Sequence, residues 1–237
     1  MFRKLVGWLA ITACAQGHAA LLPAAADTFV SGGANASTIY GGDANLLISN
    51  MGADLSLANK MYLDFDLSSL DHDVVSYWMQ FSFLDTGMGD TVISDQWRFD
   101  VYALPDGPDE LWDQSTLDWT AAPYNDTGSA DGVLTGAVFV QYFHVSGMGL
   151  WEISIGGGDN TPLVDHVMAD TNDRLTLVFV RQTEGDEIRD YIHGISALSV
   201  RLNLQAPAIP EPTMALAAIV LAMTRRPRHR RYGHAGS

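Results

Sequence analysis

Two stretches of the chain alternate strictly between apolar and polar side chains, and this pattern constrains the fold most. In Met61–Leu67, the side chains of Leu63, Phe65 and Leu67 point to one side of an extended chain. Trp97–Leu104 repeats the pattern, with its apolar residues at every second position. A period of two fits a strand with one buried face and does not fit a helix, whose period is 3.6 residues. Both stretches are therefore predicted to be β-strands.

Further stretches have the composition of strands, and short clusters rich in Gly, Asn and Asp separate them. They are Asn45–Ile48, Ser76–Leu84, Ala137–Val145, Trp151–Ile155, Arg174–Arg181 and Ser196–Leu204. The one predicted helix is short, Pro162–Ala169, where Leu163, Val164 and Val167 share a face. Many short strands at this spacing predict an all-β domain, a single two-sheet antiparallel β-sandwich of jelly-roll type, rather than a parallel α/β sheet.

The N-terminus has the order of an export signal, and residues 1–26 are predicted to be a signal peptide. Two basic residues precede the apolar stretch Leu5–Ala13. Ala24 and Ala26 then supply the small residues of an A-x-A cleavage site directly before Asp27. Cleavage there leaves a mature chain without cysteine, so its fold does not depend on disulfides.

A second interpretation of the N-terminus remains open. Ile11-Thr12-Ala13-Cys14 resembles a lipobox. In that case Cys14 would be acylated and would become the first residue of the mature protein. The apolar stretch before Cys14 is short, which favours simple cleavage after Ala26.

Near the C-terminus, Pro210, Glu211 and Pro212 precede a short apolar segment and a cluster of arginines. The prolines continue neither a helix nor a strand, so they mark an extended boundary. The apolar segment, Thr213–Thr224, has 12 residues, where a full membrane span takes about 20. The arginines are Arg225, Arg226, Arg228, Arg230 and Arg231. Arginines in such a position favour the cytoplasmic side of a membrane.

This order of motif, apolar segment and arginines resembles the PEP-CTERM sorting tail of bacterial exported proteins. The resemblance implies that an exosortase-type membrane protease reads residues 213–237, which follow a Pro-rich linker at residues 206–212. The membrane is then a transient partner, because the apolar segment is too short for permanent anchoring by itself. We therefore expect an exported protein, located at the cell surface or in the extracellular matrix.

The segment between the two ends, residues 27–205, is large enough for one well-cored domain and is strongly acidic. It holds six basic and 27 acidic residues, a net charge of −21. Such a surface repels nucleic acid and anionic membranes, so no nucleic-acid partner is expected. The chain has no H-E-x-x-H, G-x-S-x-G or phosphate-loop motif, and it is predicted not to be an enzyme.

Several stretches of this segment resemble DNRLRE-type domains, a family that overlaps carbohydrate-binding module family 96. The stretches are Ala26–Val30 with Tyr40–Ile48, Tyr62–Ser68 and Trp112–Pro123. The resemblance covers nearly all of residues 26–205. It weakens towards the C-terminal end of this segment, where Phe179-Val180-Arg181 lacks the serine of the family pattern. It implies an extracellular β-sandwich that binds polysaccharide or serves as a surface or wall module.

A glycan site is predicted on the loop that carries two tryptophans. Trp112 and Trp119 are the candidate stacking faces, and Thr116, Asp113 and Asp118 are the candidate partners of sugar hydroxyls. The alternative is that the two rings pin this loop onto the sandwich. Because basic residues are scarce, a neutral glycan is favoured, or an acidic one bridged by calcium.

A structural calcium ion is the one cofactor that the sequence suggests. Its candidate ligands at the first turns are Asp27, Asn35, Asp43 and Asn45. A second group of acids in the tryptophan loop comprises Asp106, Asp109, Glu110 and Asp113. No stretch has the EF-hand spacing, and the alternative for both groups is that these acids form solvated turns.

The function predicted from these features is a non-catalytic module that associates with glycan or exopolysaccharide. One alternative is a purely structural envelope or biofilm-matrix protein without a defined ligand. Another is a polysaccharide-degrading enzyme that uses Asp64 and Asp66 as a carboxylate pair. The identity of the glycan and the oligomeric state stay open.

Overall fold

The structure of the protein is a computed structural model. It describes residues 19–51, 54–70, 74, 76–89, 97–145, 149–155, 162–182 and 191–205. Ala19–Pro207 forms a compact unit of its own, distinct from the two chain ends. Most of the predicted signal peptide and the whole sorting tail lie outside the described residues, so both stay predictions. No helix in the described part has the length and apolarity to cross a membrane.

Eleven strands make up the described fold, and their pairings with one another are antiparallel. They are β1 (Ala19–Pro23), β2 (Ala26–Ser31), β3 (Asn45–Met51), β4 (Leu57–Asp66), β5 (Ser76–Gly89), β6 (Trp97–Ala103), β7 (Val138–Val145), β8 (Gly149–Ile155), β9 (Arg174–Gln182), β10 (Tyr191–Ser196) and β11 (Arg201–Gln205). The helices are α1 (Pro162–Ala169) and the short 3-10 turns η1 (Gly33–Asn35), η2 (Pro108–Glu110) and η3 (Ala197–Ser199).

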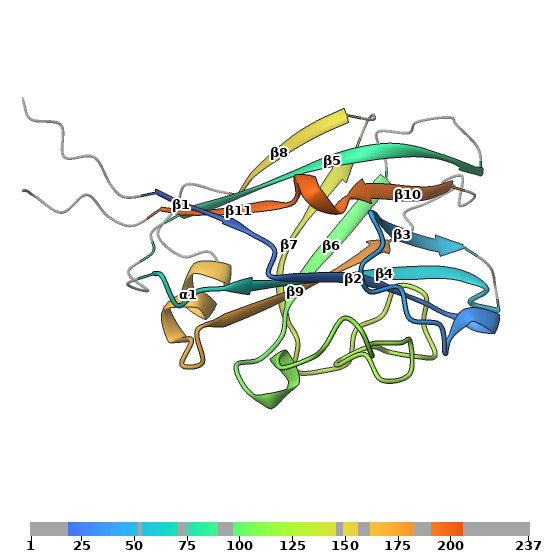
Figure 1. Ribbon diagram of the computed structural model, residues 1–237, viewed down its shortest axis with the longest axis horizontal. Coiled ribbons are helices and arrows are strands. Elements are labelled where there is room, and N and C mark those ends of the chain that lie inside the picture. Colours follow the sequence, from blue (N-terminus) through green and yellow to red (C-terminus); the bar gives the residue numbers. More distant parts are fainter. Residues whose placement is uncertain are drawn as a thin grey trace, which may run out of the picture. The chain divides into compact units, whose positions relative to one another are not determined.

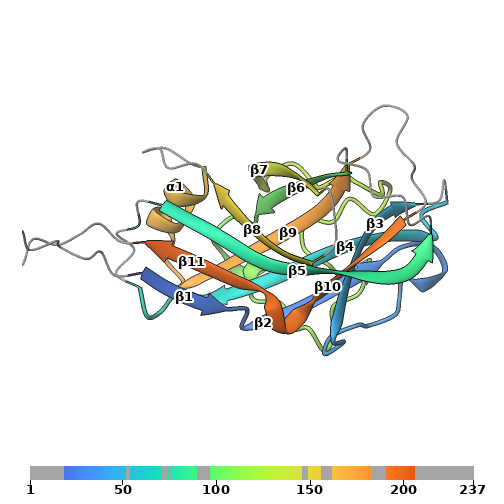
Figure 2. The ribbon, with the colours of Figure 1, turned by 90° about the horizontal axis from the view of Figure 1, so that it is seen from above.

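The strands form two layers that share β3 (Figures 1 and 2). The first sheet contains β1, β5, β8, β10 and β11, and the second contains β2, β4, β6, β7 and β9. The first half of β3 pairs with β10 and its end, Ser49–Met51, pairs with β4, so this strand passes from one sheet to the other. The arrangement confirms the predicted all-β, antiparallel sandwich.

The main core lies between the two sheets and takes the side chains that the alternating pattern predicted. Leu63 and Phe65 of β4 and Trp97 and Phe99 of β6 are fully buried there. Truncating Phe65 to Ala should therefore cost about 3–5 kcal/mol of stability. Helix α1 has the predicted bounds, and its three shared-face residues, Leu163, Val164 and Val167, are buried in the same core.

The predicted strand Ser196–Leu204 is wrong in one respect, because η3 interrupts it. The hydroxyl of Ser199 donates to the Ser196 carbonyl at 2.7 Å and accepts the Ser82 amide at 2.8 Å. Where η3 interrupts the strand, the Ser199 side chain makes hydrogen bonds in place of those between the backbones of paired strands. As a result, β10 and β11 both pair with β5, at different parts of that long strand.

Strand β1 lies inside the segment that the sequence assigned to the signal peptide. Its five residues pair with β11, from Ala19 opposite Gln205 to Pro23 opposite Arg201. Leu22 is half-buried against the main core. Cleavage after Ala26 would remove this strand and leave that edge of β11 without its partner.

Candidate functional site

The long loop between β6 and β7, residues 104–137, folds over the outer face of the second sheet (Figure 1). It brings Leu117 and Trp119 against Tyr62 of β4 and Val178 of β9, and all four side chains are buried. Strands β4 and β9 of the second sheet are therefore covered on both faces. This second core explains why Lys60, Tyr62 and Asp64, on the side of β4 opposite the main core, are buried as well.

Lys60 of β4 holds this loop in place from below. Its side chain is fully buried, and Nζ donates to Asn125 Oδ1 at 2.7 Å and to the carbonyl oxygens of Asp126 (3.0 Å) and Gly132 (2.6 Å). The ammonium also lies 4.6 Å from the centroid of the Trp119 ring. Burial lowers the pKa of Lys60 to about 8, against the attraction of nearby acids.

Trp119 also helps to hold the loop of residues 104–137 against the second sheet. Its side chain is only 2% exposed, and its Nε1 donates to the Thr127 carbonyl at 3.3 Å. Its own carbonyl accepts the side-chain amide of Asn125 at 2.6 Å. A ring in this position offers no face to a sugar. Of the two roles that the sequence left open for Trp119, the geometry supports pinning of the loop.

Trp112 lies at the edge of the second core and is half-buried. Its Nε1 donates to Thr176 Oγ1 on β9 at 3.0 Å, and its ring meets Tyr62 edge-on, with centroids 6.2 Å apart. The indole is thus fixed in direction while part of it faces solvent. The two tryptophans are not equivalent, and Trp112 is the more exposed of the pair.

The three predicted hydroxyl partners on this loop form turns. Asp113 Oδ1 accepts the Ser115 amide at 2.8 Å, and Thr116 Oγ1 donates to the Asp113 carbonyl at 3.1 Å. Asp118 Oδ1 accepts from the amide and hydroxyl of Thr120 at 2.9 and 2.8 Å. These bonds lower the pKa of Asp113, chiefly through the Ser115 amide, and of Asp118, chiefly through the Thr120 hydroxyl. Part of their hydrogen-bonding capacity is therefore already used within the loop.

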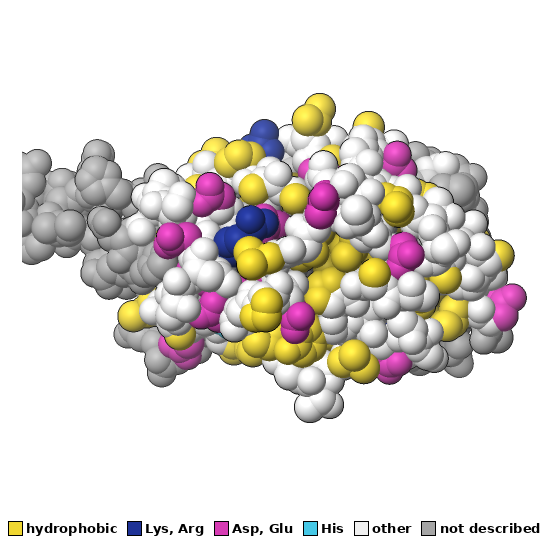
Figure 3. Space-filling view, turned by 60° about the horizontal axis from the view of Figure 1, so that its bottom comes forward, with side chains coloured by type: hydrophobic (Ala, Val, Ile, Leu, Met, Phe, Trp, Pro, Cys, Tyr) yellow, Lys and Arg dark blue, Asp and Glu magenta, His cyan; other side chains and the backbone are white. Residues whose placement is uncertain are grey.

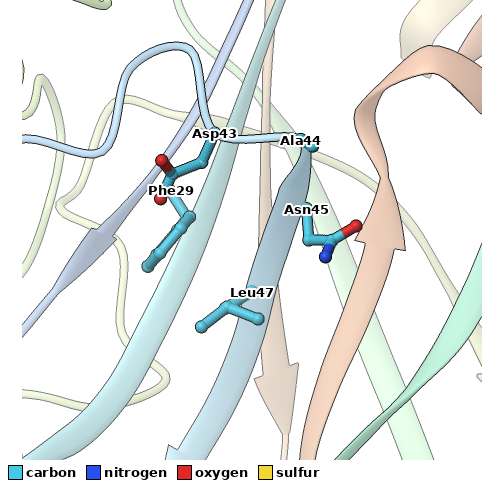
Figure 4. Close-up of a pocket in the computed structure, with 5 residues that line it drawn as sticks. All are labelled: Phe29, Asp43, Ala44, Asn45 and Leu47. Atoms are coloured by element: carbon cyan, nitrogen blue, oxygen red, sulfur yellow. The ribbon is translucent and has the colours of Figure 1, made fainter.

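The first turns of the domain form a small open pocket of about 250 Å³ (Figure 4). The lining residues are Phe29, Asp43, Ala44, Asn45 and Leu47. The Tyr40 ring stacks on Phe29 with centroids 4.2 Å apart and an interplanar angle of 24°. The pocket thus combines a carboxylate and an amide with an apolar wall.

Two of the four predicted calcium ligands, Asp43 and Asn45, share this pocket, and the other two do not line it. Asp27 lies on β2, where its amide donates to Gln114 Oε1 at 3.1 Å and burial raises the pKa of its carboxyl. Asn35 is exposed in η1. The pocket therefore collects half of the predicted ligand set, and calcium binding stays a prediction.

A different group of carboxylates meets beneath the start of the loop. One oxygen each of Asp106, Glu110 and Asp170 lies within 4.8 Å of the others. Glu110 is fully buried and accepts the Asn172 amide at 2.9 Å and the Thr176 backbone amide at 3.1 Å. Burial raises the pKa of Glu110 to about 6. Carboxylates this close suit either a hard cation or a shared proton.

The sequence indicated two members of this group and missed the third. Asp106 and Glu110 were among the acids of the tryptophan loop, whereas Asp170 follows α1 and is 60 residues further along the chain. The group does not include Asp109 or Asp113, the other acids suggested on that loop. Sequence spacing carries no signal for Asp170, because the loop and the helix meet only in the folded domain.

A row of exposed rings on the outer face of β6 and β7 was not singled out from the sequence. Phe139 and Tyr142 of β7 are 42% and 53% exposed. Tyr102 of β6 lies opposite Phe139, with ring centroids 5.5 Å apart. The alternation of β6 places Tyr102 on the outer side, but β7 does not show the matching pattern.

A β-bulge explains why the sequence of β7 does not alternate and did not indicate which residues face outward. The register passes from Val101 opposite Gln141 to Tyr102 opposite Phe139, so β7 contains one extra residue. Phe139 and Tyr142 consequently lie on one face although they are three positions apart. Strict alternation would have placed them on opposite faces.

The charge of the surface agrees with the composition of the domain. Figure 3 shows acidic side chains scattered among hydrophobic ones on the face that includes the loop side of the domain, with few basic side chains. The surface therefore has no extended basic area in this view that would attract a polyanion.

A β-sandwich that presents aromatic rings to solvent has the construction of a sugar-binding domain, because flat rings stack on the C–H faces of sugars. The family comparison agrees: residues 18–146 match the family model of carbohydrate-binding module family 96. The match covers more than half of the chain, and the protein belongs to this family. None of the curated proteins compared with the chain matches it.

The matched stretch runs from just before β1 to just after β7. It contains the tryptophan loop, the pocket and the exposed rings. Strand β9 lies beyond the match but stands between β4 and β6 in the second sheet. The part of the chain that follows residue 146 is thus needed to complete the sandwich.

Proposed function

We propose that this protein is an exported, non-catalytic module that associates with a glycan or an extracellular polysaccharide. Its membership of carbohydrate-binding module family 96 is the observation that carries the proposal. The half-exposed indole of Trp112 and the rings on β6 and β7 supply apolar faces for sugar rings. The neighbouring Asp, Thr and Arg side chains supply donors and acceptors for hydroxyl groups.

The charge of the domain favours a neutral glycan. With six basic residues against 27 acidic ones between residues 27 and 205, the domain repels polyuronates and sulfated chains at a distance. An acidic polymer would require a divalent cation to bridge it to the carboxylates. Neutral polysaccharides bind without that requirement.

The surroundings of Asp64 do not favour a role for Asp64 and Asp66 as the carboxylate pair of a glycosidase. Asp64 is fully buried, and its carboxylate receives the Arg174 guanidinium, with Nε at 3.1 Å from Oδ1. Asp66 is exposed and accepts the Ser68 amide at 2.9 Å. A catalytic pair needs both carboxyl groups at the substrate. The buried carboxylate of Asp64 is instead compensated by the partly exposed guanidinium of Arg174, which favours the non-catalytic function.

The export of the protein and the processing of its tail are proposed from the sequences of the two chain ends alone. The Pro210-Glu211-Pro212 motif, the apolar segment and the arginine cluster support export followed by processing of the tail by an exosortase-type protease. Mass spectrometry of the protein from its native host should find a C-terminus near Pro210–Thr213. An intact stretch from Arg231 to Ser237 on secreted material would contradict this proposal.

A polysaccharide panel tests the binding function directly. The full chain is passed over immobilised neutral and acidic polysaccharides, in calcium and in EGTA, and retention is measured. We expect retention on at least one neutral polysaccharide in both buffers. Retention on none would favour the alternative of a structural matrix protein without a ligand, and release of reducing ends that is lost in Asp64→Asn would favour an enzyme.

The proposed structural calcium ion is tested on the same protein. A melting temperature that rises with calcium and falls with EGTA would support an ion in the fold. Asp43→Asn should abolish the difference if the pocket holds the ion. If Asp106→Asn abolishes it instead, the predicted ligand set at the first turns is wrong.

A further inference from the structure

We propose that a neutral polysaccharide chain binds across the outer face of β6 and β7. The surface consists of Arg98, Asp100 and Tyr102 on β6 and of Phe139 and Tyr142 on β7, and it is called the β6–β7 surface below. The inference rests on the proposed function, a neutral glycan included, and adds the site. The family match identifies no residues.

The rings of this surface form a row. Tyr102 pairs with Phe139, and the adjacent outward pair is Asp100 with Tyr142. Asp100 and Tyr102 are two positions apart on β6 and so about 7 Å apart. Their partners on β7, Tyr142 and Phe139, therefore occupy successive places on the sheet. His144 continues the row, with its ring 5.6 Å from that of Tyr142. A row of separate rings suits several units of an extended polymer better than a single sugar.

Exposure distinguishes this surface from the tryptophan loop. Phe139 and Tyr142 keep 42% and 53% of their surface in solvent, whereas Trp119 keeps 2%. The rings are also held in position from below. Tyr102 is half-buried against the second core, and it meets Phe139 edge-on at an interplanar angle of 70°. Fixed rings lose little conformational freedom when a ligand stacks on them.

The ion pair on this surface selects against charged ligands. Arg98 Nε donates to Asp100 Oδ1 at 2.7 Å, and the guanidinium lies 4.3 Å from the centroid of the Tyr142 ring. The carboxylate of Asp100 compensates the positive charge of Arg98 within the surface itself. No net positive charge is then left at this pair for a uronate or a sulfate. Asp100 itself is buried, and the partly exposed guanidinium of Arg98 supplies donors for neutral hydroxyls.

Two ring substitutions test the location. Tyr142→Ala and Phe139→Ala in the full chain should each weaken retention on the neutral polysaccharide that binds the unmodified protein by about tenfold. Tyr142→Phe keeps the ring and should retain binding. Leu198→Ala is the matched control, because Leu198 is 83% exposed on η3 of the first sheet, and it should leave retention unchanged.

The outcomes separate this inference from the proposed function. If the unmodified protein binds no polysaccharide, the proposed function fails and the site falls with it. If it binds and both ring variants bind equally well, only the β6–β7 surface is wrong, and loss in Trp112→Ala would place the site on the loop. If the ring variants change only the dimer content measured by light scattering, the surface is a contact between copies.

One charge substitution tests the ligand class independently of the rings. Asp100→Asn removes a negative charge next to the guanidinium of Arg98. We expect this variant to gain retention on a polyuronate that the unmodified protein does not bind, and to lose that gain in 0.5 M salt, where charge attraction is screened. Equal behaviour of the two proteins on the polyuronate would overturn the selection proposed for this ion pair.

Discussion

The ammonium group of Lys60 lies 4.6 Å from the ring centroid of Trp119, and both side chains are buried where the loop of residues 104–137 packs on the second sheet. The contact joins a strand of the second sheet to a loop about 60 residues further along the chain. A charged group in this place is stable only because three oxygen atoms accept its hydrogen bonds. The position of the loop, and with it of Trp112, depends on this arrangement.

Lys60→Met should loosen the loop while preserving most of the apolar stem. The substitution leaves Asn125 Oδ1 and the two carbonyl oxygens without their donor, which should lower the free energy of unfolding by about 2–3 kcal/mol. Urea denaturation measures the change, with Leu198→Ala as the control. A stability equal to that of the unmodified protein would show that water replaces the ammonium at no cost.

The two tryptophans of the loop should behave differently on truncation. Trp119→Ala removes a buried ring and should cost about 3–5 kcal/mol. Trp112→Ala removes a half-buried ring with one hydrogen bond to Thr176 and should cost about 1–2 kcal/mol. Melting temperature and glycan retention are measured on both variants. Equal losses of stability would contradict the prediction that the buried Trp119 contributes more to the fold than the half-buried Trp112.

Glu110 should make the stability of the fold depend on pH. Its pKa is about 6 in the folded protein, against an ordinary value of 4.5, so the folded state binds more protons between these values. Its contribution to stability is therefore present in full below pH 4.5 and is lost as pH rises through 6. Glu110→Gln should flatten this part of the curve.

Denaturation of both proteins at several values between pH 4 and pH 7 checks this prediction. The difference between them matters, because other acids titrate in both. Parallel curves would contradict the raised pKa. A difference of opposite sign in calcium would indicate that a cation holds the carboxylates of Asp106, Glu110 and Asp170 in their ionised form.

The N-terminus of the mature protein decides whether β1 belongs to the functional fold. If β1 is retained, N-terminal sequencing of the secreted protein should start before Ala19, which the pairing with β11 favours. If the predicted cleavage after Ala26 is used, the protein starts at Asp27. If β1 contributes to the fold, a recombinant chain that starts at Ala19 should melt at a higher temperature than one that starts at Asp27, because only the longer chain keeps the pairing with β11. Equal melting temperatures would contradict that contribution.

The sequence alone determined the main features of the scaffold. The alternation of β4 and β6 identified both strands and the side of each that faces the main core, because successive side chains of a strand point to opposite faces. The bounds and the buried face of α1 followed from its local pattern. These features depend on neighbours along the chain, which a sequence displays directly.

Only the tertiary structure decided the surfaces on which the proposed function depends. The bulge in β7 turned Phe139 and Tyr142 to one face, and that shift exists only in the pairing with β6. The burial of Trp119 and the exposure of part of Trp112 depend on how the loop lies on the second sheet. Asp170 joins Glu110 because α1 and the loop meet in space. Contacts between residues far apart in the chain leave no periodic pattern in the sequence, so these relationships had to be found in the folded domain.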